Sequence, residues 1–157
     1  MRAERFWIAG KKWAPLKPKS ITKVDQVVTV RFNNELYGTS ETPGPVGALT
    51  LDTVNVSDPG NFGFRIANST TSIVSVALGT DGSSVVITLS STPEPNAKIE
   101  YAMQYDLRNT GEPADPYIRF PTAGARGCVR DSDNRDVSGF DSAPLYNWLV
   151  PFRKVID

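Results

Sequence analysis

Hydrophobic and polar residues alternate in short stretches along much of the chain. Val28, Val30 and Phe32 are separated by Thr29 and Arg31, and a repeat of two residues gives a strand one apolar and one solvated face. The same alternation recurs over residues 49–53, 62–66, 74–78, 85–89 and 99–103. Short strands at regular intervals predict an all-β fold, built as an antiparallel β-sandwich of jelly-roll type.

Turn-forming residues stand between these stretches. The sequence holds 12 Gly and 12 Pro. Gly-Thr-Asp-Gly at residues 79–82 separates the stretches 74–78 and 85–89, and Gly and Asp tolerate the backbone angles of a hairpin turn. We therefore expect these two stretches to be antiparallel neighbours.

The N-terminal residues 1–22 predict a short strand followed by an extended linker. Gly10, Pro15 and Pro18 interrupt any helix there, so we expect the strand at residues 5–8. The sandwich domain is expected over residues 23–157.

Two further segments stand out near the C-terminus. Between residues 109 and 142, Gly, Pro, Asp, Asn and Arg dominate and the apolar alternation is lost, which predicts a long loop. Loops of this length usually carry function or an interface. Residues 144–152 are dense in apolar and aromatic side chains and predict a last strand or an arm packed on the sandwich.

Length and charge limit the class of protein. The 157 residues correspond to about one domain. No apolar run approaches the roughly 20 residues of a membrane-spanning helix, so we expect no membrane insertion. The 17 Lys and Arg balance the 17 Asp and Glu, which argues against a nucleic-acid partner. The first residues lack the apolar core of a secretory signal, so none is expected.

The sequence contains no histidine. This excludes a Ser/His/Asp triad, a Cys/His pair and a His-based zinc helix. The single cysteine, Cys128, has no partner for an internal disulfide and is predicted to be a small core residue. We therefore expect that this chain is not an enzyme and binds no cofactor.

An acidic cluster in the long loop invites two chemical interpretations. Asp131 could begin a calcium loop, but Arg135 and Asp136 stand where an EF-hand needs Asp or Asn and then Gly. Asp133 or Glu112 could join Asp131 as paired carboxylates for glycoside hydrolysis, but nothing marks two of them as facing each other. We therefore predict no metal site and a solvated turn.

Aromatic residues suggest a binding surface. A flat ring in a loop can stack on the apolar face of a sugar while Asp, Asn and Arg bond its hydroxyls. The candidate carbohydrate-binding residues are Tyr105, Tyr117, Phe140, Asp131 and Asp133. For Trp13, Tyr146 and Trp148 we favour packing at the end of the sandwich or at a subunit interface, and we expect Trp148 to be buried.

Three stretches carry a resemblance to a known family. They are residues 9–18 leading into 27–32, residues 47–53 with 60–64, and Gly-Cys-Val-Arg-Asp-Ser-Asp at 127–133 with Leu-Tyr-Asn-Trp at 145–148. They resemble the region after the catalytic domain in SGNH/GDSL-type esterases, and more narrowly they resemble bacteriophage tailspike and tail-fibre proteins of the sialate O-acetylesterase-like group. The last pair of motifs is unusual, whereas the strand patterns are generic.

The resemblance implies an accessory β-sandwich of a phage virion that meets host surface polysaccharide, as a homotrimer beside other tail proteins. That family places its nucleophilic serine in a Gly-Asp-Ser block and its base in an Asp-x-x-His block, and this chain has neither. The chain would then be non-catalytic, and could be the downstream part of a split esterase. The alternative is a structural virion protein, in the tail or decorating the capsid, whose aromatic residues are buried between subunits.

Overall fold

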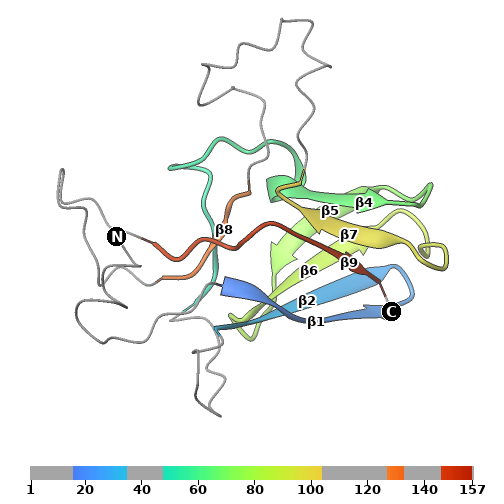
Figure 1. Ribbon diagram of the computed structural model, residues 1–157, viewed down its shortest axis with the longest axis horizontal. Coiled ribbons are helices and arrows are strands. Elements are labelled where there is room, and N and C mark those ends of the chain that lie inside the picture. Colours follow the sequence, from blue (N-terminus) through green and yellow to red (C-terminus); the bar gives the residue numbers. More distant parts are fainter. Residues whose placement is uncertain (1–15, 35–47, 104–126, 133–145, 157) are drawn as a thin grey trace, which may run out of the picture.

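A computed structural model describes residues 16–34, 48–103, 127–132 and 146–156, and the structural statements below concern these residues. The strands are β1 (Leu16–Val24), β2 (Val27–Asn34), β3 (Thr50–Leu51), β4 (Phe64–Ala67), β5 (Ile73–Leu78), β6 (Ser84–Leu89), β7 (Lys98–Tyr101), β8 (Val129–Arg130) and β9 (Phe152–Val155), with a 3-10 turn, η1, at Asn61–Gly63. Every pair of neighbouring strands is antiparallel (Figure 1). The predicted all-β fold is confirmed.

The largest sheet has four strands in the order β1-β2-β6-β5. The turn between β1 and β2 contains Asp25 with a positive φ of 52°. The turn between β5 and β6 is closed by the Gly82 N–H, which donates to the Gly79 carbonyl at 3.0 Å, with Gly82 at a φ of 66°. The predicted antiparallel hairpin of β5 and β6 is therefore confirmed.

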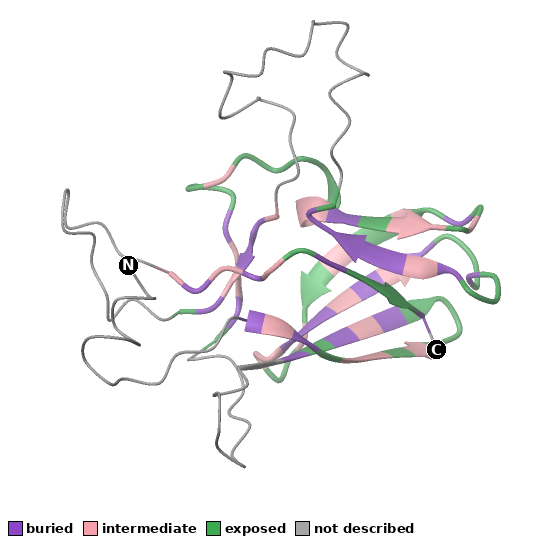
Figure 2. Ribbon diagram, in the orientation of Figure 1, coloured by how far each residue is buried: buried purple, intermediate pink, exposed green. Residues whose placement is uncertain are grey.

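A second sheet contains three strands in the order β4-β7-β9, and β3 pairs with β8 in a small ribbon. Residues of both larger sheets contribute to one hydrophobic core, and the buried residues are purple in Figure 2. In this core the Tyr101 ring lies 4.8 Å from Phe64 and stacks at 5.8 Å on Phe152. A jelly roll has two sheets of four strands, whereas the described strands form sheets of four, three and two; the sandwich and its jelly-roll topology stay predictions.

The predicted linker before residue 23 is wrong over residues 16–22. These residues belong to β1, which pairs with β2 from Leu16 to Val24. Pro18 is tolerated because β1 is an edge strand and the register shifts between Pro18 and Ser20. The strand expected at residues 5–8 lies outside the described residues.

Local turns shorten three of the predicted strands, of which 99–103 ends at Tyr101 because Ala102 has a φ of 50°. Over residues 49–53 only Thr50–Leu51 is strand, because the next residue, Asp52, accepts backbone N–H groups of the turn that follows. The stretch 62–66 starts late, since Phe62 has a φ of 55° inside η1 and its N–H donates to the Asp58 carboxylate at 2.9 Å. Ordinary strand pairing begins at Phe64.

The C-terminal region also differs from its prediction. The long loop expected at 109–142 contains β8 within the described residues 127–132, and residues 109–126 and 133–142 lie outside the described residues. The last strand is β9, from Phe152 to Val155, so it begins where the predicted apolar segment ends. Among the helices of the described residues, none is long and apolar enough to cross a membrane.

Core burial sets the first prediction. Ile87 has no exposed surface at the centre of β6, so Ile87→Ala should lower the free energy of unfolding by about 2–5 kcal/mol through lost contacts and a cavity. Urea unfolding followed by circular dichroism measures this change. The control is Val54→Ala, since Val54 is 94% exposed and should change stability by about 0.5 kcal/mol or less. Equal effects of the two substitutions would contradict this packing.

Candidate functional site

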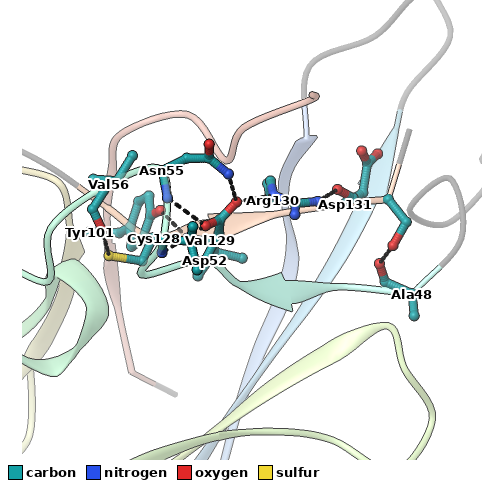
Figure 3. A network of polar contacts seen from close by, with 11 residues as sticks. Ala48, Asp52, Asn55, Val56, Tyr101, Cys128, Val129, Arg130 and Asp131 are labelled. Atoms are coloured by element: carbon teal, nitrogen blue, oxygen red, sulfur yellow. Dashed lines mark hydrogen bonds and ion pairs between the residues drawn. The ribbon is translucent and has the colours of Figure 1, made fainter. Parts of the chain in front are cut away.

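The β3–β8 ribbon lies at the end of the molecule opposite the β1–β2 turn (Figure 1). Polar side chains gather around it, although both strands contain only two residues. We refer to five residues, Asp52, Arg130, Asp131 and Asn147 with Ala48, which takes part through its carbonyl, as the anchor cluster. Figure 3 shows how the contacts of this region follow one another along the ribbon.

Asp52 lies at the centre of the anchor cluster. Its carboxylate is only 4% exposed. One oxygen accepts the backbone N–H groups of Val54 and Asn55 at 3.0 and 2.9 Å, and the other accepts the Asn55 side-chain amide at 2.7 Å. The aspartate thus builds a local Asx turn that ends β3. The Asp52 N–H in turn donates to the carbonyl of Cys128 at 2.7 Å.

Arg130 supplies the cation of the anchor cluster. Its Nε lies 2.5 Å from Asp52 Oδ2, and its Nη1 donates to the Asp131 carbonyl at 3.0 Å. Its guanidinium carbon lies 3.6 Å from the ring centre of Tyr146, a cation–π contact. With only 13% of its side chain exposed, Arg130 joins three separate segments of the chain.

Asp131 and Asn147 form a buried pair beside this cation. The Asn147 side-chain amide donates to the Asp131 carboxylate at 3.2 Å, and the Asp131 N–H donates to the Asn147 carbonyl at 3.1 Å. Next to them, the Ser132 hydroxyl donates to the Ala48 carbonyl at 2.5 Å. These bonds tie residue 48 to residue 132 and residue 131 to residue 147.

The ribbon is anchored to the core by Tyr101. The hydroxyl of Tyr101 accepts the Val129 N–H at 2.9 Å, and burial raises the pKa of this phenol above its ordinary value. Gly127 lies so close that a Cβ there would overlap the Tyr101 ring. The predicted core position of Cys128 is confirmed, because it is buried and its thiol donates to the Val56 carbonyl at 3.7 Å.

Backbone contacts connect β1 to the chain beside the anchor cluster. Leu16 pairs with Asn34 in the sheet and forms a bridge with Leu149. The Leu149 N–H donates to the Val129 carbonyl at 2.9 Å. Together with the bond from Ser132 to Ala48, these contacts join β1, β8 and residue 48 in one network.

Hydrogen bonds hold the Asp52 carboxyl in its charged form. Burial alone would raise its pKa, but the bonds from Asn55 and Arg130 outweigh it and place the pKa well below the ordinary value. The same balance holds at Glu100 on β7. Burial raises the pKa of its carboxyl, but the guanidinium groups of Arg65 and Arg153 lower it by more, so the pKa lies below its ordinary value. Glu100 accepts from Arg65 on β4 and Arg153 on β9, so its carboxylate spans all three strands of its sheet.

The contacts of the anchor cluster serve to position the chain. Its carboxylate at residue 52 is paired with a cation and shielded from solvent, which suits positioning better than acid–base transfer. Among the residues that the structure describes, no group of three or more His, Cys, Asp and Glu side chains could hold a metal ion. The arrangement holds residues 48–52, 130–132 and 147 together.

The structure locates three of the residues predicted from sequence. Asp131 has no exposed surface, so a direct contact with sugar, as predicted for it, is not available in this structure. Tyr146 is half-buried against Arg130. Trp148 is half-buried rather than buried, because its strand neighbours Asn147 and Leu149 turn their side chains inward instead. The residues Trp13, Tyr105, Tyr117, Asp133 and Phe140 lie outside the described residues.

Sequence reasoning overlooked Asp52, Arg130 and Asn147 as a connected group. One local signal was available for Asp52, since an Asx turn is favoured where Asp ends a strand and polar residues follow. Arg130 lies 78 residues from Asp52, and no local pattern indicates a pair over that separation. Asn147 is polar inside an apolar segment, and its burial against Asp131 explains that exception.

Removing the cation of the anchor cluster should be costly. Arg130→Met leaves the Asp52 carboxylate buried without its ion-pair partner, and breaking such a pair costs about 3–5 kcal/mol. Urea unfolding measures the loss. The matched control is Arg31→Met, because the Arg31–Asp81 pair has the same chemistry but 56% and 33% of its side-chain surfaces exposed, and should cost about 1 kcal/mol or less. Similar losses at both sites would contradict the role assigned to burial.

The lowered carboxyl pKa values predict loss of stability in acid. The pKa is depressed at Asp52, Asp81 and Glu100, and that of Glu94 falls to about 2. The unfolded chain therefore binds more protons than the native one, so the stabilisation is complete above the unfolded pKa of about 4 and is lost as pH falls through the native values. Thermal unfolding between pH 7 and pH 2 should show a steadily falling midpoint.

Asp52→Asn provides the control for the acid prediction. This variant should be less stable at pH 7 because the ion pair with Arg130 is lost. It should also depend less on pH below 4, since one carboxyl with a depressed pKa has been removed. Parallel pH profiles of the variant and the parent chain would show that Asp52 does not contribute to acid unfolding.

Comparison of the chain with protein-family models, with curated proteins and with solved structures finds no match.

Proposed function

We propose that this chain is a non-catalytic accessory domain of a phage tailspike or tail fibre, in which the end of the molecule around the anchor cluster carries the residues that bind host surface carbohydrate. It would act in the virion, outside the cell, beside other tail proteins. The motifs at residues 127–133 and 145–148 motivate the phage assignment. Both motifs lie in or directly beside the anchor cluster.

The rigid polar network of the anchor cluster is the observation that supports this proposal most. Recognition sites are commonly built from loops that a rigid scaffold positions. A buried ion pair and a buried amide–carboxylate pair provide such a scaffold here.

The residue types on two segments of the chain favour sugar as the ligand. Tyr105 and Tyr117 lie on the segment 104–126, and Asp133 and Phe140 lie on the segment 133–145. Rings supply flat apolar surface for a pyranose face, and carboxylates accept bonds from its hydroxyls. The net charge of zero favours a ligand recognised by stacking and hydrogen bonds over one recognised by overall charge.

One observation favours the alternative of a structural virion protein. Two of the aromatic residues that the structure describes, Tyr146 and Trp148, are half-buried, and Tyr146 is held by Arg130. Partly covered aromatic surface of this kind is also typical of subunit interfaces. In this alternative the same end of the molecule binds a neighbouring tail protein and has no affinity for sugar.

Direct binding to bacterial surface polysaccharides tests the proposal. The purified chain is passed over immobilised capsular and O-antigen polysaccharides, and binding is measured by biolayer interferometry. We expect binding to at least one of them, with Tyr117→Ala and Phe140→Ala each weakening it by about tenfold or more, which corresponds to about 1.4 kcal/mol. Val24→Ala is the control, since Val24 is 72% exposed at the opposite end of β1.

The outcomes separate the two functions. A folded chain that binds none of the polysaccharides but assembles with tail proteins supports the structural alternative. If the parent chain binds sugar and both aromatic variants bind equally well, these two rings are not in the binding site.

A further inference from the structure

Among the described residues, the two main sheets end in four edge strands, whose outer backbone N–H and C=O groups can pair with another strand except at Leu16 of β1, which already accepts from Val150. The edges are β1 and β5 in the four-stranded sheet and β4 and β9 in the three-stranded sheet. Proteins usually protect such edges with charged side chains, proline or irregular pairing. The four edges of this protein differ in whether they carry this protection.

Three of the edges carry charged side chains. β1 contains Lys17, Lys19 and Lys23 together with Pro18, and its register shifts there. β4 contains Arg65. β9 contains Arg153 and Lys154 in a strand of only four residues. Each of these edges resists pairing with a copy of itself, because like charges would face each other across the contact.

β5 is different from the other edges. Its sequence, Ile-Val-Ser-Val-Ala-Leu, contains no charge and no proline. Its only irregularity is a register shift between Ile73 and Ser75, after which four residues pair regularly with β6. Val74 is 64% exposed and Leu78 is 38% exposed. This edge combines high strand propensity with apolar surface that the described residues do not cover.

The hairpin turn determines which backbone groups β5 leaves open. The Gly79 N–H donates to the Ser84 carbonyl at 2.8 Å, so Gly79 belongs to a hydrogen-bonded pair. Such pairs alternate along an antiparallel ladder, which directs the backbone groups of Ala77 toward β6 and those of Val76 and Leu78 away from it. The open edge of β5 therefore presents the N–H and C=O groups of Val76 and Leu78.

We propose that β5 pairs antiparallel with β5 of a second copy of this chain. A two-fold axis at Val76 would let the two Val76 residues exchange both backbone hydrogen bonds, and would bring Leu78 of each copy beside Val74 of the other. The two four-stranded sheets would join into one continuous sheet, and the exposed apolar side chains would be covered.

We choose a second copy of this chain as the partner because the β5 edge is complementary to itself. A two-fold contact places the same strand opposite itself, which is unfavourable for the charged edges and favourable for an uncharged one. The zero net charge of the chain adds no repulsion between copies. Since the opposite edge, β1, carries Lys and Pro, sheet extension stops at two copies and does not continue into a fibre.

Sedimentation velocity over a range of concentrations tests this dimer. The parent chain should dimerise, and Val74→Lys should raise the dimer dissociation constant about tenfold or more, because each lysine loses apolar contact beside Leu78 of the other copy. The monomer should tolerate the lysine, since Val74 is largely exposed. Val24→Lys is the matched control: Val24 is 72% exposed on the opposite edge of the same sheet, and its variant should dimerise like the parent chain.

Amide hydrogen exchange provides a second measurement that does not depend on a substitution. The Val76 and Leu78 amides should become protected as concentration rises, whereas the Ala77 amide, bonded to β6, should be protected at all concentrations. A chain that stays monomeric, or a dimer or trimer that forms equally well with Val74→Lys and leaves the Val76 amide unprotected, would overturn the proposal. The carbohydrate-binding experiment is independent of both results, because its residues lie outside β5.

Discussion

The ion pair between Asp52 and Arg130 is the contact on which the end of this protein around β3 and β8 depends. Two-residue strands such as β3 and β8 have too few backbone bonds to hold a position by themselves. The buried carboxylate compensates by ending β3 in an Asx turn and accepting the guanidinium of β8. Because Arg130 also contacts Tyr146, one charged group joins segments that are distant in sequence.

The remaining polar residues divide into those that stabilise the body and those that position its end. Glu100 lies between Arg65 and Arg153 and strengthens the three-stranded sheet across its strands. Asp131 and Asn147 instead connect the residues that follow β8 with those that precede Trp148.

The two edges of the four-stranded sheet differ in charge, and burial alone would not produce this difference. The lysines and proline of β1 and the uncharged sequence of β5 lie on opposite sides of the same sheet. Hydrophobic burial inside the body places no demand on charge at either edge. The difference is therefore better explained by what each edge meets outside the chain.

The sequence by itself determined the strands whose alternation is local. Residues 28–32, 74–78 and 85–89 became β2, β5 and β6 because a two-residue repeat commits one face of each strand to the core. Tertiary structure decided the rest: Leu16–Val24 became a strand only through pairing with β2, and β8 formed only where β3 and Tyr101 could bond its backbone. The same holds for Asp52 and Arg130, since a contact between residues 78 positions apart depends on how the whole chain packs and leaves no periodic signal in the sequence.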